Sequence, residues 1–183
     1  MNLNLSHYSA LVIIPSSDVW PAIQSIRQRH DSKVKRWMPH ITLVYPFIAV
    51  EQFDTIAEPI RQACETISPF EVSLSAFKSF RHRRGKHTVW LDPQPNDAVE
   101  ELRAMISRSI AGFSQQFTKL PRRFRPHLSV GQCQGHEQLS QLVDQLQSEW
   151  KPVSFEVSKV SLIWRNDPND DVFRVETEID LRV

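Results

Sequence analysis

The sequence predicts an α+β, bilobal duplicated fold in which two antiparallel sheets face a central groove and helices lie on the outer faces. Three observations lead to this prediction. The chain contains an internal repeat, its expected strands and helices do not alternate in the strict manner of a parallel sheet, and two expected strands each begin with Pro-His. The repeat indicates two lobes, and the order of elements indicates antiparallel sheets.

Three segments recur in the same order at nearly constant spacing, which indicates an internal duplication. The most specific is FEVS, which occurs unchanged at 70–73 and at 155–158. We therefore expect a single bilobal domain over 1–183, with pseudo-repeat lobes of roughly 1–86 and 87–183. The other two matches pair 39–43 with 126–130 and 51–60 with 137–146.

Each repeat is expected to contain a strand, a helix, a second strand, a second helix and a third strand, in that order. The helices are predicted from apolar residues that recur every three or four positions. The third strand of each repeat leads into a turn and a further strand, which is typical of a hairpin. The expected strands are 9–15, 39–47, 70–73, 87–93, 126–132 and 155–158, the helices are centred on 18–30, 53–67, 102–113 and 139–150, and the turns are 81–87 and 165–171.

The two Pro-His strands carry the candidate catalytic residues. Side chains alternate between the faces of a strand, so an imidazole and a hydroxyl two positions apart point to one side while their aliphatic neighbours point to the core. If an approximate two-fold axis relates the lobes, the two pairs face each other across the groove. The four candidate catalytic residues are His40 and Thr42 in the first strand, and His127 and Ser129 in the second.

This set of groups suits phosphodiester chemistry. A neutral imidazole can accept a proton from an attacking hydroxyl or water, an imidazolium can protonate the leaving oxygen, and hydroxyls can donate to the phosphoryl oxygens. The scheme needs no metal and no cofactor, and the sequence contains no HExxH, no clustered Asp/Glu set and no glycine-rich phosphate loop. The alternative, two core strands with hydrogen-bonded histidines, does not explain why a costly polar pair is kept in both copies.

The HITL and HLSV tetrads, placed 87 residues apart in a chain of 183, resemble the motifs of the 2H phosphoesterase superfamily, which includes 2'-5' RNA ligases and cyclic phosphodiesterases. The resemblance implies a bilobal fold, acid–base roles for His40 and His127, phosphate binding by Thr42 and Ser129, and 2',3'-cyclic phosphates or RNA ends as substrates. Some members of this superfamily bind nucleotides with little turnover, which keeps a binding role open.

Positive charge is concentrated although the net charge is only +1. Fourteen of the 22 Lys and Arg residues lie in 27–36, 78–86 and 119–125, where Trp37, Phe80 and Phe124 are interleaved with them. Cations mixed with aromatic rings are suited to binding phosphates and stacking bases, although a run of charge is also typical of a solvated surface. The candidate substrate-binding residues are Arg125 for phosphate and Tyr45 or Trp164 for a base, with Tyr45 reaching the groove only if its strand bends near Pro46.

The function we expect from the sequence is that of a metal-independent phosphodiesterase acting on 2',3'-cyclic phosphates or 2'-5' linkages of RNA or nucleotides. The alternatives are a non-catalytic module that binds nucleotides or RNA ends in the same groove, and an adaptor whose basic face meets an acidic protein. The partner is expected to be an RNA end or a nucleotide, not a membrane, and the protein a monomer. Two separated cysteines, Cys64 and Cys133, and the absence of a long apolar run favour the cytoplasm.

Overall fold

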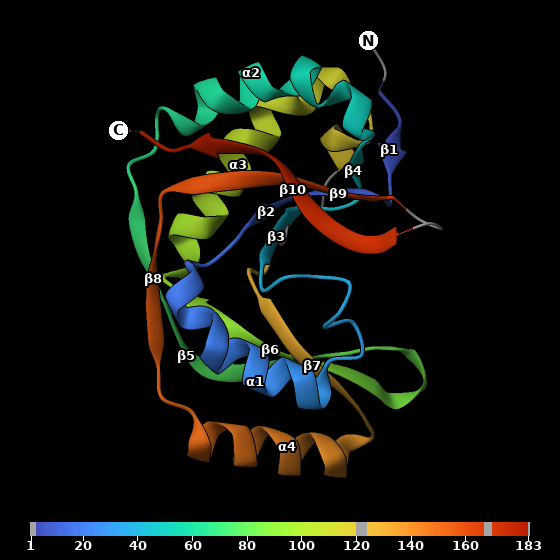
Figure 1. Cartoon of the computed structure of the whole chain (residues 1–183), viewed down its shortest axis with the longest axis vertical. Helices are drawn as coiled ribbons and strands as arrows, with labels where there is room; N and C mark the ends of the chain where they lie inside the picture. Colours follow the sequence, from blue (N-terminus) through green and yellow to red (C-terminus); the bar gives the residue numbers. More distant parts are fainter. Residues whose placement is uncertain (1–2, 120–123, 167–169, 183) are drawn as a thin grey trace.

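The computed structural model describes residues 3–119, 124–166 and 170–182 as an α+β fold (Figure 1), which confirms the predicted class. Helices α2 and α3 lie together at one end of the molecule and α4 lies at the opposite end. The strands are β1 (Leu5–Ser6), β2 (Ser9–Ile13), β3 (Ile41–Val44), β4 (Phe47–Ile48), β5 (Phe70–Arg81), β6 (Lys86–Gln94), β7 (Leu128–Gln134), β8 (Val153–Val157), β9 (Lys159–Asn166) and β10 (Asp170–Asp180), and the helices are α1 (Trp20–His30), α2 (Phe53–Cys64), α3 (Asn96–Ile110) and α4 (His136–Glu149).

The two predicted sheets are the two halves of one antiparallel sheet of eight strands, in the order β10-β9-β2-β3-β7-β6-β5-β8. The halves meet at β3 and β7, where the register contains one residue pair, Ile41 with Leu128. A separate two-stranded sheet pairs β1 with β4. Each half therefore contributes four strands, and the two Pro-His strands are the ones that meet.

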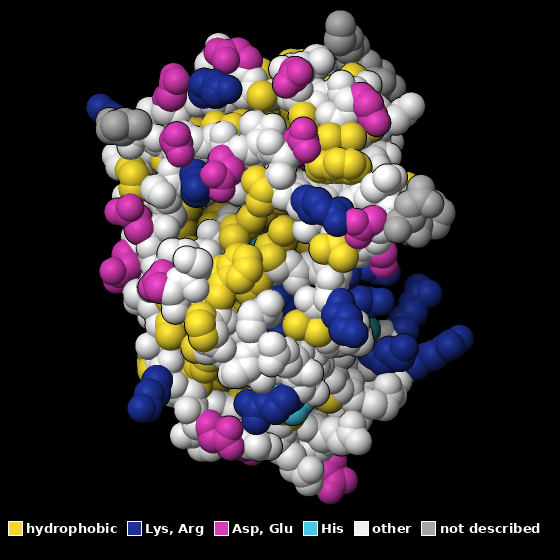
Figure 2. Space-filling model, in the orientation of Figure 1, with side chains coloured by type: hydrophobic (Ala, Val, Ile, Leu, Met, Phe, Trp, Pro, Cys, Tyr) yellow, Lys and Arg dark blue, Asp and Glu magenta, His cyan; other side chains and the backbone are white. Residues whose placement is uncertain are grey.

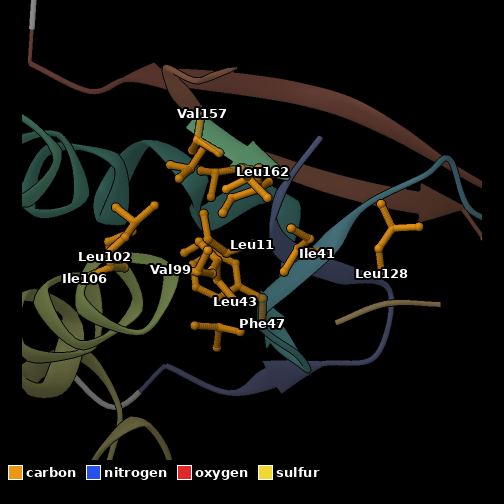
Figure 3. Close-up of a cluster of buried hydrophobic side chains, with 14 of the residues drawn as sticks. Leu11, Ile41, Leu43, Phe47, Val99, Leu102, Ile106, Leu128, Val157 and Leu162 are labelled. Carbon is orange, nitrogen blue, oxygen red and sulfur yellow. The ribbon is translucent and has the colours of Figure 1, made fainter. Parts of the chain in front are cut away.

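Each half of the sheet draws strands from both sequence repeats. Strand β5, from the first repeat, pairs with β6 and β8, whereas β9, from the second repeat, pairs with β2 and carries β10 on its other edge. The helices follow the same exchange, because α1 packs against β7, while Val99 and Leu102 of α3 belong to the same buried cluster as Leu11 of β2 (Figure 3). The division of the chain at 86 and 87 stays a prediction about the repeats, and in space the repeats are interleaved.

The expected hairpins are present where the structure describes them. Strands β5 and β6 pair antiparallel around a short turn at Arg83–Gly85, and β9 pairs with β10 in the same way. Part of the turn expected at 165–171 lies outside the described residues. Positions 120–123 of the third basic segment lie outside them as well.

The main hydrophobic core lies on one face of the sheet, and a smaller apolar cluster lies on the other. Ile41 and Leu128 are fully buried on the core side, together with Leu43 and Val130 (Figure 3). Strand β2 is buried on both faces, which explains its continuous apolar sequence. We call the face opposite the main core the site face; its apolar cluster consists of Ala10, Val12, Ile163 and Phe173, with Ile14, Trp37 and Met38 packed against it.

No helix in the described ranges is long and apolar enough to cross a membrane.

The C-terminus of α1 approaches β7 closely at Gly131. A Cβ atom on Gly131 would lie 2.7 Å from the Cβ of His30 and 3.1 Å from its carbonyl oxygen. Because backbone atoms cannot move aside as a flexible side chain can, only glycine fits at this position of β7. This contact fixes the end of α1, and with it the start of the segment that leads to His40.

We predict that Gly131→Ala lowers the free energy of unfolding by about 1–3 kcal/mol, because the added methyl group overpacks the contact with α1. Urea denaturation of the variant and the wild type measures the difference. Gly112→Ala is the matched control, since no atom lies within 4 Å of the position its Cβ would take. Equal stability of the two variants would contradict the assigned contact.

Candidate active site

The pair Ile41–Leu128 determines the direction of the four candidate catalytic side chains. Both members are 0% exposed and point into the main core. Since neighbouring side chains in a strand point to opposite faces, the residues before and after each member point to the site face. These residues are His40, Thr42, His127 and Ser129.

The antiparallel register also brings the two imidazoles close together. When the pairing of Ile41 with Leu128 is continued by one residue, His40 lies opposite Ser129 and has His127 as its diagonal neighbour. Diagonal neighbours in an antiparallel pair have Cβ atoms about 7–8 Å apart, within reach of each other's rings across a bound group. The positive charge of His127 contributes to lowering the pKa of His40, in agreement with this proximity.

Both histidines are held in the same tautomer by the same local contact. Nδ1 of His40 lies 2.7 Å from the carbonyl oxygen of Met38, and Nδ1 of His127 lies 2.8 Å from that of Arg125. A carbonyl oxygen only accepts, so each Nδ1 carries the hydrogen and donates it. In the neutral ring this leaves Nε2 as an acceptor, and in the charged ring it makes Nε2–H a donor. Each imidazole can therefore exchange a proton through Nε2 while Nδ1 stays fixed.

Aromatic rings support His40 from one side. The indole of Trp37 stacks on the imidazole at 4.7 Å with an interplanar angle of 19°, and Phe173 of β10 stacks on the same indole at 3.7 Å. The rings join β10 to the segment that precedes β3. Trp37 is thus engaged in packing with two rings, which makes it a support for His40 and not the open base-stacking surface that the sequence suggested.

A different arrangement supports His127. The edge of its ring meets Phe80 at 4.9 Å and 87°, and Trp90 at 5.9 Å and 64°. Phe80 and Trp90 stack on each other across β5 and β6, and Trp90 is the register partner of Ser129. The second half of the sheet therefore holds its histidine by edge contacts, where the first half uses a stack.

Burial lowers the pKa of both imidazoles. The pKa of His40 falls to about 4, chiefly through burial, and the charges of Arg27 and His127 lower it further while the Met38 carbonyl and Asp31 oppose the shift. Burial lowers the pKa of His127 as well, against the hydrogen bond to its backbone acceptor. Both rings are thus neutral at pH 7 in the free protein, and a bound anion would favour their protonation.

The two hydroxyls are accessible from the site face. Thr42 and Ser129 are both half-buried. Within the described ranges, no hydrogen bond to another protein group engages either hydroxyl. Each can therefore donate its hydrogen to an oxygen atom of a ligand held between the imidazoles.

A buried ion pair anchors the segment between α1 and His40. Nε of Arg27 donates to Asp31 at 3.0 Å and its Nη2 donates to the carbonyl oxygen of Trp37 at 2.9 Å. The other oxygen of Asp31 accepts from the side chain of Gln132 on β7, whose own oxygen accepts from the backbone of Ser32. These bonds tie the support of His40 to the strand that follows His127.

The structure brings two of the three candidate substrate-binding residues to the site and separates the third. Arg125 is exposed, and its guanidinium carbon lies 6.0 Å from the ring centre of Phe80, which contacts His127. Tyr45, which is 41% exposed, meets the edge of Trp37 at 5.6 Å, because β3 ends at Val44 and the chain bends there as the sequence required.

Trp164 lies on the opposite face of the sheet. On β9 it alternates with Ile163, which points to the site face, so its indole packs against the main core and donates to Glu176. The expectation that Trp164 stacks a base is thus not met by its position. No local signal could have excluded Trp164, because the face that each β9 side chain presents depends on the pairing of β9 with β2.

Sequence reasoning did not identify Phe173, Trp90 or the network of Arg27, Asp31 and Gln132 as parts of the site. Phe173 and Trp90 come from strands that only the sheet order places beside the histidines. Trp90 could have been found from its expected strand at 87–93, had the pairing of that strand with the second Pro-His strand been known. Phe124, which lies among the cations in the sequence, packs under Arg103 and against the main core.

The fold is shared with solved structures of low sequence identity. Thermus thermophilus TT0787 superposes with a TM-score of 0.66 at 13% identity, covering 96% of this chain and 98% of that one. Escherichia coli LigT, solved in complex with 3'-AMP, gives a TM-score of 0.62 at 15% identity over 96% and 98% of the two chains. These comparisons define a protein with the LigT-like α+β fold.

The chain belongs to the 2'-5' RNA ligase superfamily, whose sequence profile matches residues 15–169. This is the 2H phosphoesterase superfamily that the HITL and HLSV tetrads indicated, so the resemblance is confirmed. A Geobacillus kaustophilus protein, GK0864, whose name assigns it provisionally to the phosphoesterases, is 30% identical over 122 residues. That alignment covers 66% of this chain and 66% of GK0864, so the match spans slightly less than two thirds of the relative.

We predict that Trp37→Ala raises the pKa of His40 toward 6.5, because removing the indole admits water and reduces the cost of charging the ring. The chemical shift of the His40 ring proton, followed by NMR as a function of pH, measures this pKa. Trp37→Phe, which keeps an aromatic ring, is the control, and His127 in the same samples is an internal reference. An unchanged His40 pKa in Trp37→Ala would show that the stack does not shield the imidazole.

Proposed function

We propose that this protein is a metal-independent phosphodiesterase that hydrolyses 2',3'-cyclic phosphates or 2'-5' linkages of RNA or nucleotides. His40 and His127 are the proton acceptor and donor, and Thr42 and Ser129 bind the phosphoryl oxygens. The proposal rests above all on one observation. Two imidazoles lie on either side of the pair Ile41–Leu128 on a common face, each with Nδ1 held by the carbonyl two residues before it.

The reaction follows from these contacts. Nε2 of one neutral imidazole accepts a proton from water as the water oxygen forms a bond to phosphorus. The bond from phosphorus to the ribose oxygen breaks in line with the attack, and Nε2–H of the other imidazolium donates its proton to that oxygen. The hydroxyls donate to the non-bridging oxygens, where negative charge builds up in the transition state. The protonation states of the two rings are exchanged at the end, and solvent restores them.

Substrate binding supplies the charged ring that the reaction needs. Both imidazoles are neutral in the free protein because burial lowers their pKa values. A phosphodiester carries one negative charge, and an opposite charge in contact with an imidazole raises its pKa. The anion therefore promotes protonation of the ring beside the leaving oxygen. Charging is easier for His127, because only the pKa of His40 is further lowered by the charge of Arg27.

A nucleotide is the ligand to test first. LigT, which has the same fold, has been solved with 3'-AMP bound. The present protein has an exposed guanidinium, Arg125, near His127 and an exposed phenol ring, Tyr45, near the support of His40. These two groups are suited to a second phosphate oxygen and to the edge of a base, respectively.

We predict that His40→Ala and His127→Ala each reduce kcat for a nucleoside 2',3'-cyclic phosphate at least about 100-fold, since each removes one proton-transfer group. Chromatography of the products over time measures the rate, and the wild type is expected to keep full activity in EDTA. His136→Ala, an exposed histidine at the start of α4, is the matched control and should be unaffected. Activity that survives both substitutions would end the proposal. Tight calorimetric binding of 3'-AMP by a wild type that turns over no substrate would identify a binding module instead.

The pH dependence provides an independent test. One imidazole must be neutral and the other charged, so kcat/KM follows a bell between the two pKa values of the free protein. Both values lie below 6.5, so we predict an optimum of kcat/KM below pH 6.5. The bound anion raises the pKa values in the complex, so the optimum of kcat lies at higher pH. Initial rates from pH 4 to 9 provide both profiles, and a kcat/KM optimum above pH 7 would contradict the assignment.

A further inference from the structure

The hairpin between β5 and β6 carries a cluster of cations that the proposed reaction does not use. We call this cluster the basic arm. In Figure 2, Lys and Arg side chains gather on the side of the molecule to which this hairpin projects in Figure 1, while Asp and Glu predominate at the end formed by α2. The basic arm consists of Arg81, Arg83, Arg84 and Lys86.

The charge of the basic arm is not neutralised. All four of its cations are exposed, and none of them forms an ion pair within the described ranges of the chain. The sequence contains no acidic residue from 72 to 91, and none from 32 to 50 or from 102 to 136, the segments that hold the two histidines. By contrast, Arg61 and Lys159 on other surfaces pair with Glu58 and Glu178.

The basic arm is fixed in place and is not a loose loop. The side chain of Gln134, at the end of β7, donates to the carbonyl oxygen of Arg84 at 2.6 Å. The backbone N–H of Gly135 donates to the carbonyl oxygen of Gly85 at 2.8 Å. Arg84 has a φ of 59° and ψ of 30°, so the turn has a defined left-handed position. The chain pays little further conformational entropy when a ligand binds to such a surface.

The basic arm is continuous with the candidate active site. Phe80, which immediately precedes Arg81, contacts the ring of His127. At the other end, β7 runs from Leu128, next to His127, to Gln134, which contacts the arm. Seven residues of antiparallel strand span about 20 Å. The arm cations therefore lie beside the far end of β7, about 20 Å along that strand from His127.

This distance exceeds the length of one nucleotide. Phosphates of a stacked strand follow one another at about 3.4 Å along the axis, so 20 Å corresponds to roughly six nucleotides. A mononucleotide held between His40 and His127 would leave most of the basic arm without a ligand. An RNA strand with its 3' end at the same place would pass its phosphates along the arm.

We propose that the basic arm binds the phosphate backbone of an RNA strand whose 3' end lies between His40 and His127, so that the preferred substrate is an oligonucleotide and not a mononucleotide. This inference rests on the proposed function for the identity of the reacting end. An acidic protein would also be attracted to the cations. The RNA strand fits better because the arm is joined to two imidazoles whose Nδ1 atoms are fixed and whose Nε2 atoms are suited to a phosphate, a group that an acidic protein of Asp and Glu lacks.

The test removes three charges from the arm without altering its backbone. The variant combines Arg81→Ser, Arg83→Ser and Arg84→Gly, where glycine is chosen because it favours a positive φ. The matched control combines Arg61→Ser, Lys151→Ser and Lys159→Ser, which removes the same charge from exposed positions elsewhere. Both are compared with the wild type on uridine oligonucleotides of about one to ten residues that end in a 2',3'-cyclic phosphate, a range that brackets the estimated path. Thermal melting confirms that both proteins fold.

We predict that kcat/KM of the wild type rises with length up to roughly six nucleotides and then levels off. In the arm variant, kcat/KM for the longest substrate falls at least about 10-fold, and the slope of its logarithm against the logarithm of salt concentration becomes about 2 units less steep. The mononucleotide is turned over at the wild-type rate by the arm variant, and the control behaves as the wild type does on all substrates. Equal losses on short and long substrates, or no loss on either, would overturn the inference.

Binding separates failure of this inference from failure of the proposed function. If no substrate is turned over, the proposed hydrolysis is wrong, and fluorescence anisotropy with the longest labelled oligonucleotide tests the arm directly. Weaker binding by the arm variant than by the control would still support the arm as an RNA surface. Equal binding by both, or competition by a polyglutamate peptide as effective as that of unlabelled RNA of equal charge, would overturn it.

Discussion

The pairing of Ile41 with Leu128 is the contact on which the site depends. It is the residue pair through which β3 meets β7, and so it joins the two halves of the sheet. Both side chains are fully buried, and a slip of either strand by one residue would expose an aliphatic side chain and bury an imidazole. Burial of two apolar residues therefore fixes the face and the spacing of His40 and His127. The geometry of the proposed chemistry is a consequence of hydrophobic packing on the reverse side.

The two imidazoles occupy equivalent positions in the two repeats, but different kinds of ring contact support them. His40 is stacked on Trp37 beside a buried guanidinium, whereas His127 meets Phe80 and Trp90 edge-on and has an exposed Arg125 nearby. The greater cost of charging His40 breaks the symmetry of the repeat. A duplicated strand can in this way supply two different groups, one kept neutral and one more readily protonated. The exchange of strands between the halves allows this, because each histidine is surrounded by residues from both repeats.

Much of the site could be predicted from the sequence because it depends on local rules. Alternation in a strand was enough to place His40 with Thr42 and His127 with Ser129, and those positions follow in the structure from the same rule. The same rule predicted that Tyr45 reaches the site only if its strand bends near Pro46. Strand β3 ends at Val44, and Tyr45 lies against Trp37. Trp164 was misplaced because its strand lies two places from β3, and the face it presents depends on pairing with β2 that no local pattern reveals. The division of the chain into two repeats stays a prediction, and the strand order interleaves these repeats in space.

The sequence by itself determined the α+β class, the superfamily, and the four polar residues that share one face, because these depend on periodicity and on motifs of a few adjacent residues. Only the tertiary structure decided that eight strands form one sheet, that Trp37 packs between its neighbours and is not an open platform, and that the Arg27–Asp31–Gln132 network anchors the segment before His40. Those features join residues more than a hundred positions apart in the chain, such as Asp31 with Gln132 and Trp37 with Phe173. Contacts at such separations are selected by the packing of the whole core, so no short stretch of sequence contains them.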